Sequence, residues 1–344
     1  MGGKNLFAGT ILGVAAMLAS VMAQAAESPH YEAAKREGLV NWYTTLIIDT
    51  AVIPLVSAFE KRYPGVKVTY SRADSTPTIL KILNEAKAGK IAADVTDGTG
   101  TSPPLQAEGL LAKYAPTGSE VYPAALKDRD GYWIANILYF MTPAINTQMV
   151  KPADVPKKLD DLLDSKWKGG KIAWSNTTSG GASFIGAVLA TMGEQAGMDF
   201  LQKLSKQQIV NLGISARAAV QKVAEGEYPM ALGIFNHHTI IDSEKGAPVT
   251  WLPLEPIIAP LSVESVLKDA PHPNAARLFI DFLVSEEAAQ VLADVGFLPA
   301  HPKVSGRTPS LKPEGGLFKA YFASPEYVAE NLAKWQKIRK DLFE

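Results

Sequence analysis

The residues best suited to chemistry form a run of small polar side chains from Asn176 to Ser183. The run follows a short apolar segment, Ile172–Trp174, and precedes apolar residues at helical spacing that begin with Phe184. A strand, a turn and a helix start are therefore predicted, and glycines and hydroxyls beside unpaired helix N–H groups favour an anion site. An ordinary N-cap is the alternative. The residues assigned here as ligand contacts are Thr178, Ser179, Gly180 and Ser183.

Polar side chains also follow three predicted strands in the first part of the chain. The strands Leu39–Tyr43, Val66–Tyr70 and Ala93–Thr96 alternate with segments of helical apolar spacing. This order predicts a parallel sheet with helices on both faces, and ligands of such sheets bind at the carboxyl ends of the strands. The candidate ligand-binding residues at these ends are Thr44, Thr45, Arg72, Asp97, Gly98 and Thr99.

Two arginines are candidates for gripping a negatively charged ligand. Arg72 follows a predicted strand, and Arg217 lies in the first turn of a helix that Ser215 is expected to cap. A guanidinium can hold a carboxylate or phosphate with two parallel hydrogen bonds, although a solvated surface arginine is the simpler reading of each. Asp97 could bind an amine or a metal, but we favour a turn-capping role before Gly98.

A third group of candidates, Asn236, His237 and His238, follows a predicted strand at Met230–Phe235. Adjacent side chains on an extended segment point in opposite directions. One imidazole at most then faces a ligand easily, unless the strand has already ended. The rings could coordinate a metal or donate hydrogen bonds to an anion.

The whole chain limits the function classes. It has 344 residues, a formal net charge of −1 and no cysteine, so we expect two domains, no nucleic-acid partner, no disulfides and no thiolate metal site. Residues 1–25 have a positive start, an apolar run and an Ala-x-Ala site, as a cleavable secretory signal does. A soluble exported protein in the periplasm is the expectation.

Two apolar segments are expected to connect the domains. Trp133–Ile145 is interpreted as one strand passing into the second domain, and Val249–Leu254 as the return. The predicted α/β lobes are residues 26–138 with 255–344, and residues 139–254. The last helix is predicted at Pro325–Phe343.

Several stretches together resemble a known family. They are Gly38–Thr45, Ser71–Ala73, Asn84–Gly89 and Ala270–Leu283. The chain is similar to the periplasmic solute-binding components of ABC importers, in the ferric-iron-binding-protein-like branch. This resemblance implies a two-lobed type II periplasmic-binding fold with a hinge of crossing strands. It also implies a ligand held between the lobes, delivery to an inner-membrane permease, and no catalysis.

One departure from that branch concerns the ligand. Its iron-binding members have adjacent tyrosines where this chain has His237 and His238, and imidazole suits divalent metals better than ferric ion. Members also take small organic anions or phosphonates. We therefore expect a monomer that needs no cofactor or metal and binds a small anion more weakly as pH rises through the histidine range.

Two alternatives stay open. One is a ferric or divalent metal site at His237 and His238, with Asp97 or Glu255 as weak further candidates. The other is an exported hydrolase, which lacks support because neither a Gly-x-Ser-x-Gly elbow nor a His-Glu-x-x-His pair occurs.

Overall fold

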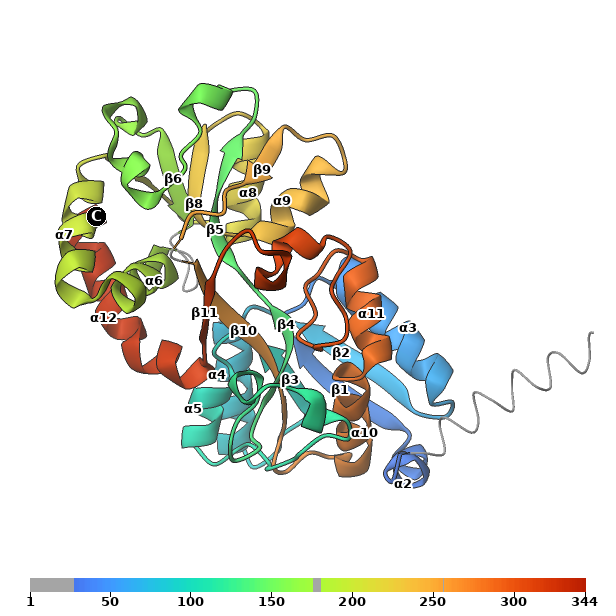
Figure 1. The fold of residues 1–344 in the computed structure, drawn as a ribbon. Coiled ribbons are helices and arrows are strands. Elements are labelled where there is room, and N and C mark those ends of the chain that lie inside the picture. The colour runs from blue at the N-terminus through green and yellow to red at the C-terminus, as the bar shows by residue number, and fades with distance from the viewer. Residues whose placement is uncertain (1–27, 176–180, 256) are drawn as a thin grey trace, which may run out of the picture. The chain divides into compact units, whose positions relative to one another are not determined.

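The computed structural model describes residues 28–175, 181–255 and 257–344 and divides into two compact units (Figure 1). Unit 1 contains residues 28–122, 127–134 and 264–291. Unit 2 contains residues 123–126, 135–263 and 292–344, apart from residues 176–180 and 256. Both units are mixed α/β, as the sequence predicts.

Unit 1 is built on parallel strands. Its elements in chain order are α2 (Tyr31–Glu37), β1 (Leu39–Thr44), η1 (Ile48–Val52), α3 (Ile53–Arg62), β2 (Lys67–Arg72), α4 (Ser75–Lys87), β3 (Val95–Gly98), α5 (Ser102–Ala107), η2 (Ser119–Val121), α10 (Pro273–Leu283) and most of α11 (Glu286–Asp294). Strand β1 lies between β2 and β3 and pairs with both in parallel, which confirms the predicted β-α-β-α-β pattern.

The two faces of strand β1 explain how unit 1 is packed. Trp42 contacts Phe279 of α10 with a ring-centroid distance of 5.2 Å, while the neighbouring Tyr43 packs with Ile82 of α4 and Leu105 of α5. Successive side chains of a strand point to opposite faces, so the pair covers both sides of the sheet with helices. Both carboxyl ends, of β1 and of β3, are thereby held at one edge.

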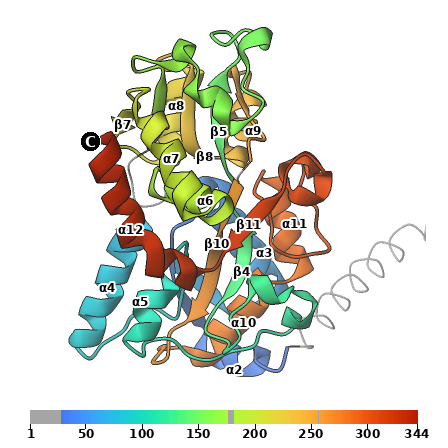
Figure 2. The same cartoon turned by 60° about the vertical axis from the view of Figure 1, so that its left-hand side comes forward.

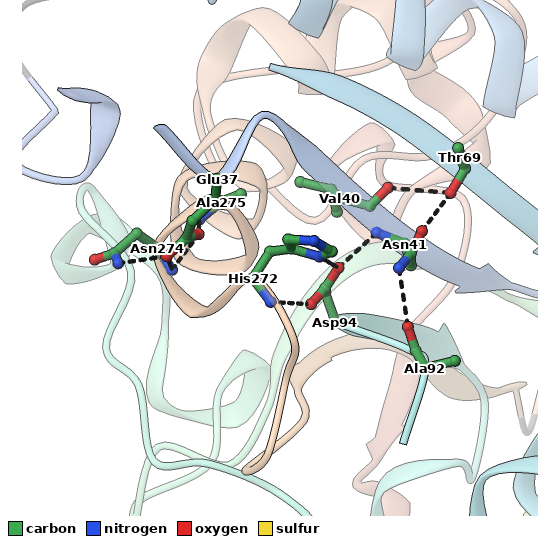
Figure 3. A network of polar contacts seen from close by, with 9 residues as sticks. All are labelled: Glu37, Val40, Asn41, Thr69, Ala92, Asp94, His272, Asn274 and Ala275. Atoms are coloured by element: carbon green, nitrogen blue, oxygen red, sulfur yellow. Dashed lines mark hydrogen bonds and ion pairs between the residues drawn. The ribbon is translucent and has the colours of Figure 1, made fainter. Parts of the chain in front are cut away.

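A polar network joins α10 to α2 and β1 (Figure 3). Oδ2 of Asp94 accepts a hydrogen bond from the backbone N–H of Asn41 at 2.7 Å and lies 2.9 Å from Nδ1 of His272, while Oδ1 accepts from the backbone N–H of His272 at 2.7 Å. His272 therefore has a structural role in unit 1. Glu37 accepts from the backbone N–H groups of Asn274 at 3.0 Å and Ala275 at 2.8 Å, in the first turn of α10.

Glu37 therefore caps α10 from outside the helix, and its loss has a predictable cost. Glu37→Ala should lower the free energy of unfolding by about 1–2 kcal/mol, because two helix N–H groups lose a charged acceptor at the positive end of the helix. Glu37→Gln keeps the length and should lose about half of that. Urea unfolding measures the effect, and an unchanged midpoint for Glu37→Ala at unchanged slope would contradict it.

Unit 2 contains a five-stranded sheet in the order β7-β6-β8-β5-β9, of which β7, β8 and β5 are labelled in Figure 2. Its elements are η3 (Ala124–Leu126), β4 (Ile134–Leu138, of which Ile134 belongs to unit 1), β5 (Met141–Asn146), η4 (Pro152–Asp154), η5 (Leu159–Leu163), η6 (Ser165–Trp167), β6 (Ile172–Ser175), α6 (Gly181–Met192), α7 (Glu194–Ser205), β7 (Val210–Leu212), α8 (Ala216–Ala224), β8 (Met230–Phe235), α9 (Asn236–Ser243), β9 (Val249–Trp251), β10 (Ile257–Val266, ending in unit 1), η7 (Pro309–Leu311), η8 (Pro313–Gly315), β11 (Ala320–Ala323) and α12 (Pro325–Phe343).

The alternation along β8 separates two apolar layers in unit 2. Leu232 joins Trp174 and Trp335 in the larger cluster, which α6, α7 and α12 complete. Ala231 joins Val220 of α8 in the smaller cluster on the other face. Strand β6 runs parallel to β8, so the carboxyl ends of both strands, which lead toward α6 and α9, lie at one edge.

The two segments expected to connect the domains differ from the prediction. Trp133–Ile145 forms two strands, because β4 pairs with β10 whereas β5 pairs with β8 and β9. Val249–Leu254 contributes β9, which lies wholly in unit 2, and the chain passes from unit 2 into unit 1 within β10. The last helix is confirmed as α12.

Candidate functional site

The carboxyl ends of β1 and β3 bring several predicted residues of unit 1 together. Thr45 donates to Oδ1 of Asp97 from its backbone N–H at 2.8 Å and from its hydroxyl at 2.6 Å. Thr44 pairs in register with Arg72 on the neighbouring strand. The sheet thus gathers these candidate residues at one edge, as their positions after the strands predict.

Asp97 lies buried at this edge of the sheet and links β3 to the turn after β1. Its side chain is fully buried, and burial raises the pKa of its carboxyl group, opposed by the hydrogen bonds from the threonines. Its Oδ2, like the hydroxyls of Thr96 and Ser102, is buried without a hydrogen-bond partner in the described part of the chain. Asp97 therefore holds the turn after β1, a role close to the predicted cap.

Gly98 has a close-packed environment at the end of β3. A Cβ added there would lie 2.8 Å from Cγ2 of Thr101, 2.9 Å from Cγ2 of Thr45 and 3.0 Å from Oγ of Ser75, and its φ is +138°. Ser75 begins α4, so the helix start, the turn after β1 and the end of β3 converge on this glycine.

Arg72 is more accessible than Thr44, Thr45 and Asp97. Its guanidinium lies 2.8 Å from a carboxylate oxygen of Asp74, with side-chain exposures of 40% and 73%. An exposed ion pair of this kind contributes about 0–1 kcal/mol, so exchange of Asp74 for another anion costs little. Thr99, one residue beyond β3, is half-buried.

The histidines of unit 2 lie on a helix rather than on an extended segment. Strand β8 ends at Phe235, as predicted, and α9 begins at Asn236, so the side chains of His237 and His238 do not diverge as they would on an extended segment. Asn236 donates from its backbone N–H to the carbonyl of Phe140 at 3.0 Å and from Nδ2 to the carbonyl of Leu311 at 2.9 Å. These bonds fix the first turn of α9, which carries both imidazoles.

Aromatic side chains surround His237. Its ring centroid lies 5.4 Å from that of Tyr139, 5.2 Å from that of Phe297 and 4.3 Å from that of His238, and its side chain is fully buried. Both ring nitrogens of His237, Nδ1 of His238 and Oδ1 of Asn236 are buried without a hydrogen-bond partner among the described residues.

Burial keeps both imidazoles neutral. It lowers the pKa of His237 to about 3, helped by the positive charge of Arg217, and lowers the pKa of His238 well below its ordinary value. The prediction of a protonated ring that strengthens anion binding in the histidine range is therefore wrong. A neutral imidazole still offers one N–H donor and one nitrogen acceptor.

Arg217 is already engaged within unit 2. It donates to both carboxylate oxygens of Asp242 and, at 3.0 Å, to the backbone carbonyl of His238. Ser215 caps α8 through its hydroxyl, as predicted, and so sets the position of Arg217 in the first turn. The sequence reasoning missed Asp242, although its place one helical turn after His238 could have indicated it.

The remaining candidates are less informative. Ser183 is buried in the first turn of α6, while Thr178, Ser179 and Gly180 lie outside the described residues. Glu255 accepts a hydrogen bond from the backbone N–H of Lys319 at 2.9 Å. Within residues 28–175, 181–255 and 257–344, no three His, Asp or Glu side chains are grouped so that they could hold a metal ion. No helix in these ranges has the length and apolar character to cross a membrane.

Comparisons with known proteins place this geometry in context. A family model described as bacterial extracellular solute-binding protein matches residues 101–315. Iron uptake protein A1 of Synechocystis sp. is 25% identical over 249 residues, which are 66% of this chain and 67% of that protein.

Solved structures of solute-binding proteins are similar to this chain as well. Iron-bound HitA from Pseudomonas aeruginosa has a TM-score of 0.73 and 25% identity, with 88% of this chain and 99% of that chain covered. The periplasmic binding protein AfuA from Actinobacillus pleuropneumoniae, with fructose-6-phosphate bound, has a TM-score of 0.69 and 22% identity, with 88% and 99% covered, and shares the fold. The likeness to such two-lobed proteins confirms the predicted fold class.

Proposed function

Because this chain belongs to the family of bacterial extracellular solute-binding proteins, the substrate-binding components of ABC-type transporters, we propose that it captures a small anionic solute. An organic acid or a phosphonate-like compound is the solute class. The proposal includes export to the periplasm through residues 1–25, delivery to an inner-membrane permease, and no catalytic step.

The observation that carries the proposal is the first turn of α9. Asn236, His237 and His238 place four buried side-chain nitrogen and oxygen atoms there without partners in the described residues. A buried polar group left unpaired costs about 1–3 kcal/mol, so such a cluster lowers stability, as expected where residues serve binding rather than packing.

The charge at this turn favours an anion. The first N–H groups of a helix have no intrahelical acceptor and carry partial positive charge. Here they accompany the neutral imidazole of His238, which can donate one hydrogen bond. Unit 1 has donors suited to an anion of its own, Arg72 and the hydroxyl-bearing residues after β1 and β3.

A metal ion is the second candidate, and two observations favour it. Iron is named for both the Synechocystis relative and the Pseudomonas aeruginosa structure. Neutral imidazoles are also competent metal ligands, because no proton competes for the nitrogen. The anion ranks first because the described residues group no third His, Asp or Glu ligand with the two histidines.

Calorimetry separates the two candidates. After chelator treatment, the protein is titrated with citrate, inorganic phosphate and fructose 6-phosphate, and separately with ferric and zinc ions. Binding of one of the anions by metal-free protein supports the proposal. Binding of a metal ion, with no anion bound until that ion is added, would overturn it.

Arg72 provides a sharper test in unit 1. Arg72→Ala should weaken binding of the anion identified above by about tenfold or more, since a hydrogen bond to a charged group contributes about 1.5–3 kcal/mol. Asp74→Ala is the matched control: it releases Arg72 from its ion pair and should leave affinity unchanged or tighter. Equal losses in both variants would show that the ion pair, rather than Arg72 itself, matters.

A further inference from the structure

Arg217 makes three charge-assisted contacts to a single helix. Its Nη1 donates to the carbonyl of His238 at 3.0 Å and to Oδ2 of Asp242 at 2.7 Å, and its Nη2 donates to Oδ1 of Asp242. The side chains of Arg217 and Asp242 are only 24% and 11% exposed. A bidentate, partly buried pair of this kind is much stronger than the exposed pair of Arg72 with Asp74.

The contacts span one turn of α9. His238 lies in the first turn and Asp242 one turn later, while Arg217 comes from the first turn of α8. One guanidinium therefore ties two points of α9 to α8, which fixes the rotation of α9 about its own axis. That rotation decides where the side chains of the first turn point.

The two histidines of this turn differ in access. His237 is fully buried, with both ring nitrogens enclosed and its ring packed against Tyr139 and Phe297. His238 is 7% exposed, and of its two nitrogens only Nδ1 is buried without a partner, which leaves Nε2 as the accessible atom.

We infer that Arg217 and Asp242 form a positioning pair that presents Nε2 of His238 to the solute and keeps His237 in the aromatic core. This inference rests on the proposed function, because it assigns the solute contact to one of the two histidines. It also reassigns Arg217: the guanidinium acts through α9 and is not itself a contact to the solute.

Chemical modification tests the inference without any solute. Diethyl pyrocarbonate acylates accessible, unprotonated imidazole nitrogens, and peptide mass spectrometry locates each product. In the unaltered protein at neutral pH, we expect His238 to be modified and His237 to be protected. Faster modification of His237 than of His238 would overturn the assignment.

Variants of the pair test the positioning role. In Arg217→Ala, the protection of His237 should fall by about tenfold or more, because charge-assisted hydrogen bonds of about 1.5–3 kcal/mol each no longer hold α9. Asp242→Asn should lose part of the protection and Arg217→Lys should restore part of it. His30, half-buried in unit 1, is the internal control, and its modification rate should not change.

Two results would overturn the positioning role. One is an unchanged modification pattern in Arg217→Ala. The other is a loss of protection at His30 together with His237 in every variant, including Arg217→Lys, which would indicate general unfolding instead of a local change.

Citrate binding by variants of Arg217 and His238 tests whether the pair affects solute affinity. Citrate titrations should show at least about tenfold weaker binding for His238→Gln and for Arg217→Ala, and a smaller loss for Arg217→Lys. If the unaltered protein binds none of the anions, the proposed function fails, while the modification pattern still decides whether the pair positions His238. If citrate binds and His238→Gln leaves its affinity unchanged, the assignment to His238 is wrong.

Discussion

Lowering the pH from 7 to 5 should reduce the free energy of unfolding by about 2 kcal/mol through His237 alone. The pKa of its imidazole is about 3 in the folded protein, against an ordinary value of 6.5. His238 should add a loss of the same sign, because burial lowers its pKa as well.

The direction follows from where each state takes up its proton. In the unfolded chain the imidazole binds a proton below about pH 6.5, whereas the folded ring stays neutral until the pH approaches 3. Between these values the unfolded state binds more protons, so stability falls as the pH falls. The neighbouring Arg217 acts in the same direction, and the paired Asp242 only partly offsets its charge.

Urea unfolding at pH 5, 6 and 7 measures this loss, with His237→Phe as the matched variant. Phenylalanine fits the stack of Tyr139, Phe235 and Phe297 but cannot take up a proton. His237→Phe should therefore lose about 2 kcal/mol less than the unaltered protein between pH 7 and pH 5. Equal losses in both proteins would show that His237 is not buried and neutral in solution.

Much of the fold could be predicted because its signals are local. The alternation of Trp42 and Tyr43, the apolar spacing of α12 and the order of strands and helices each follow from neighbouring residues. These patterns also place the candidate residues after the right strands. The break between β4 and β5 had no such signal: Pro143 lies inside β5, at an irregularity of its pairing with β8.

The roles of the site residues depended on contacts that no local pattern records. The start of α9 has no capping side chain, because Phe235 precedes it, so no helix was predicted directly after the strand Met230–Phe235. Arg217 and Asp97 have the residue types of ligand contacts. Each instead forms hydrogen bonds with a residue of another element: Arg217 with Asp242, and Asp97 with Thr45.

Gly98 should be the least replaceable glycine at the edge formed by β1 and β3. Gly98→Ala is expected to lower the free energy of unfolding by about 3 kcal/mol, of which about 1 kcal/mol is backbone strain at positive φ and about 2 kcal/mol is overpacking. The overpacking arises because the new Cβ would lie within 3.0 Å of Thr45, Ser75 and Thr101. The same crowding should displace the turn after β1 and weaken solute binding.

Gly100 separates the two causes. Its φ is +92°, yet a Cβ there meets no atom within 4 Å, so Gly100→Ala should show the backbone strain without the overpacking. Its expected loss is about 1 kcal/mol. Urea unfolding of both variants gives the packing contribution as the difference, about 2 kcal/mol. Equal losses would mean that Thr45, Ser75 and Thr101 move aside freely, and the convergence of β1, β3 and α4 on Gly98 would then not be what orders this edge.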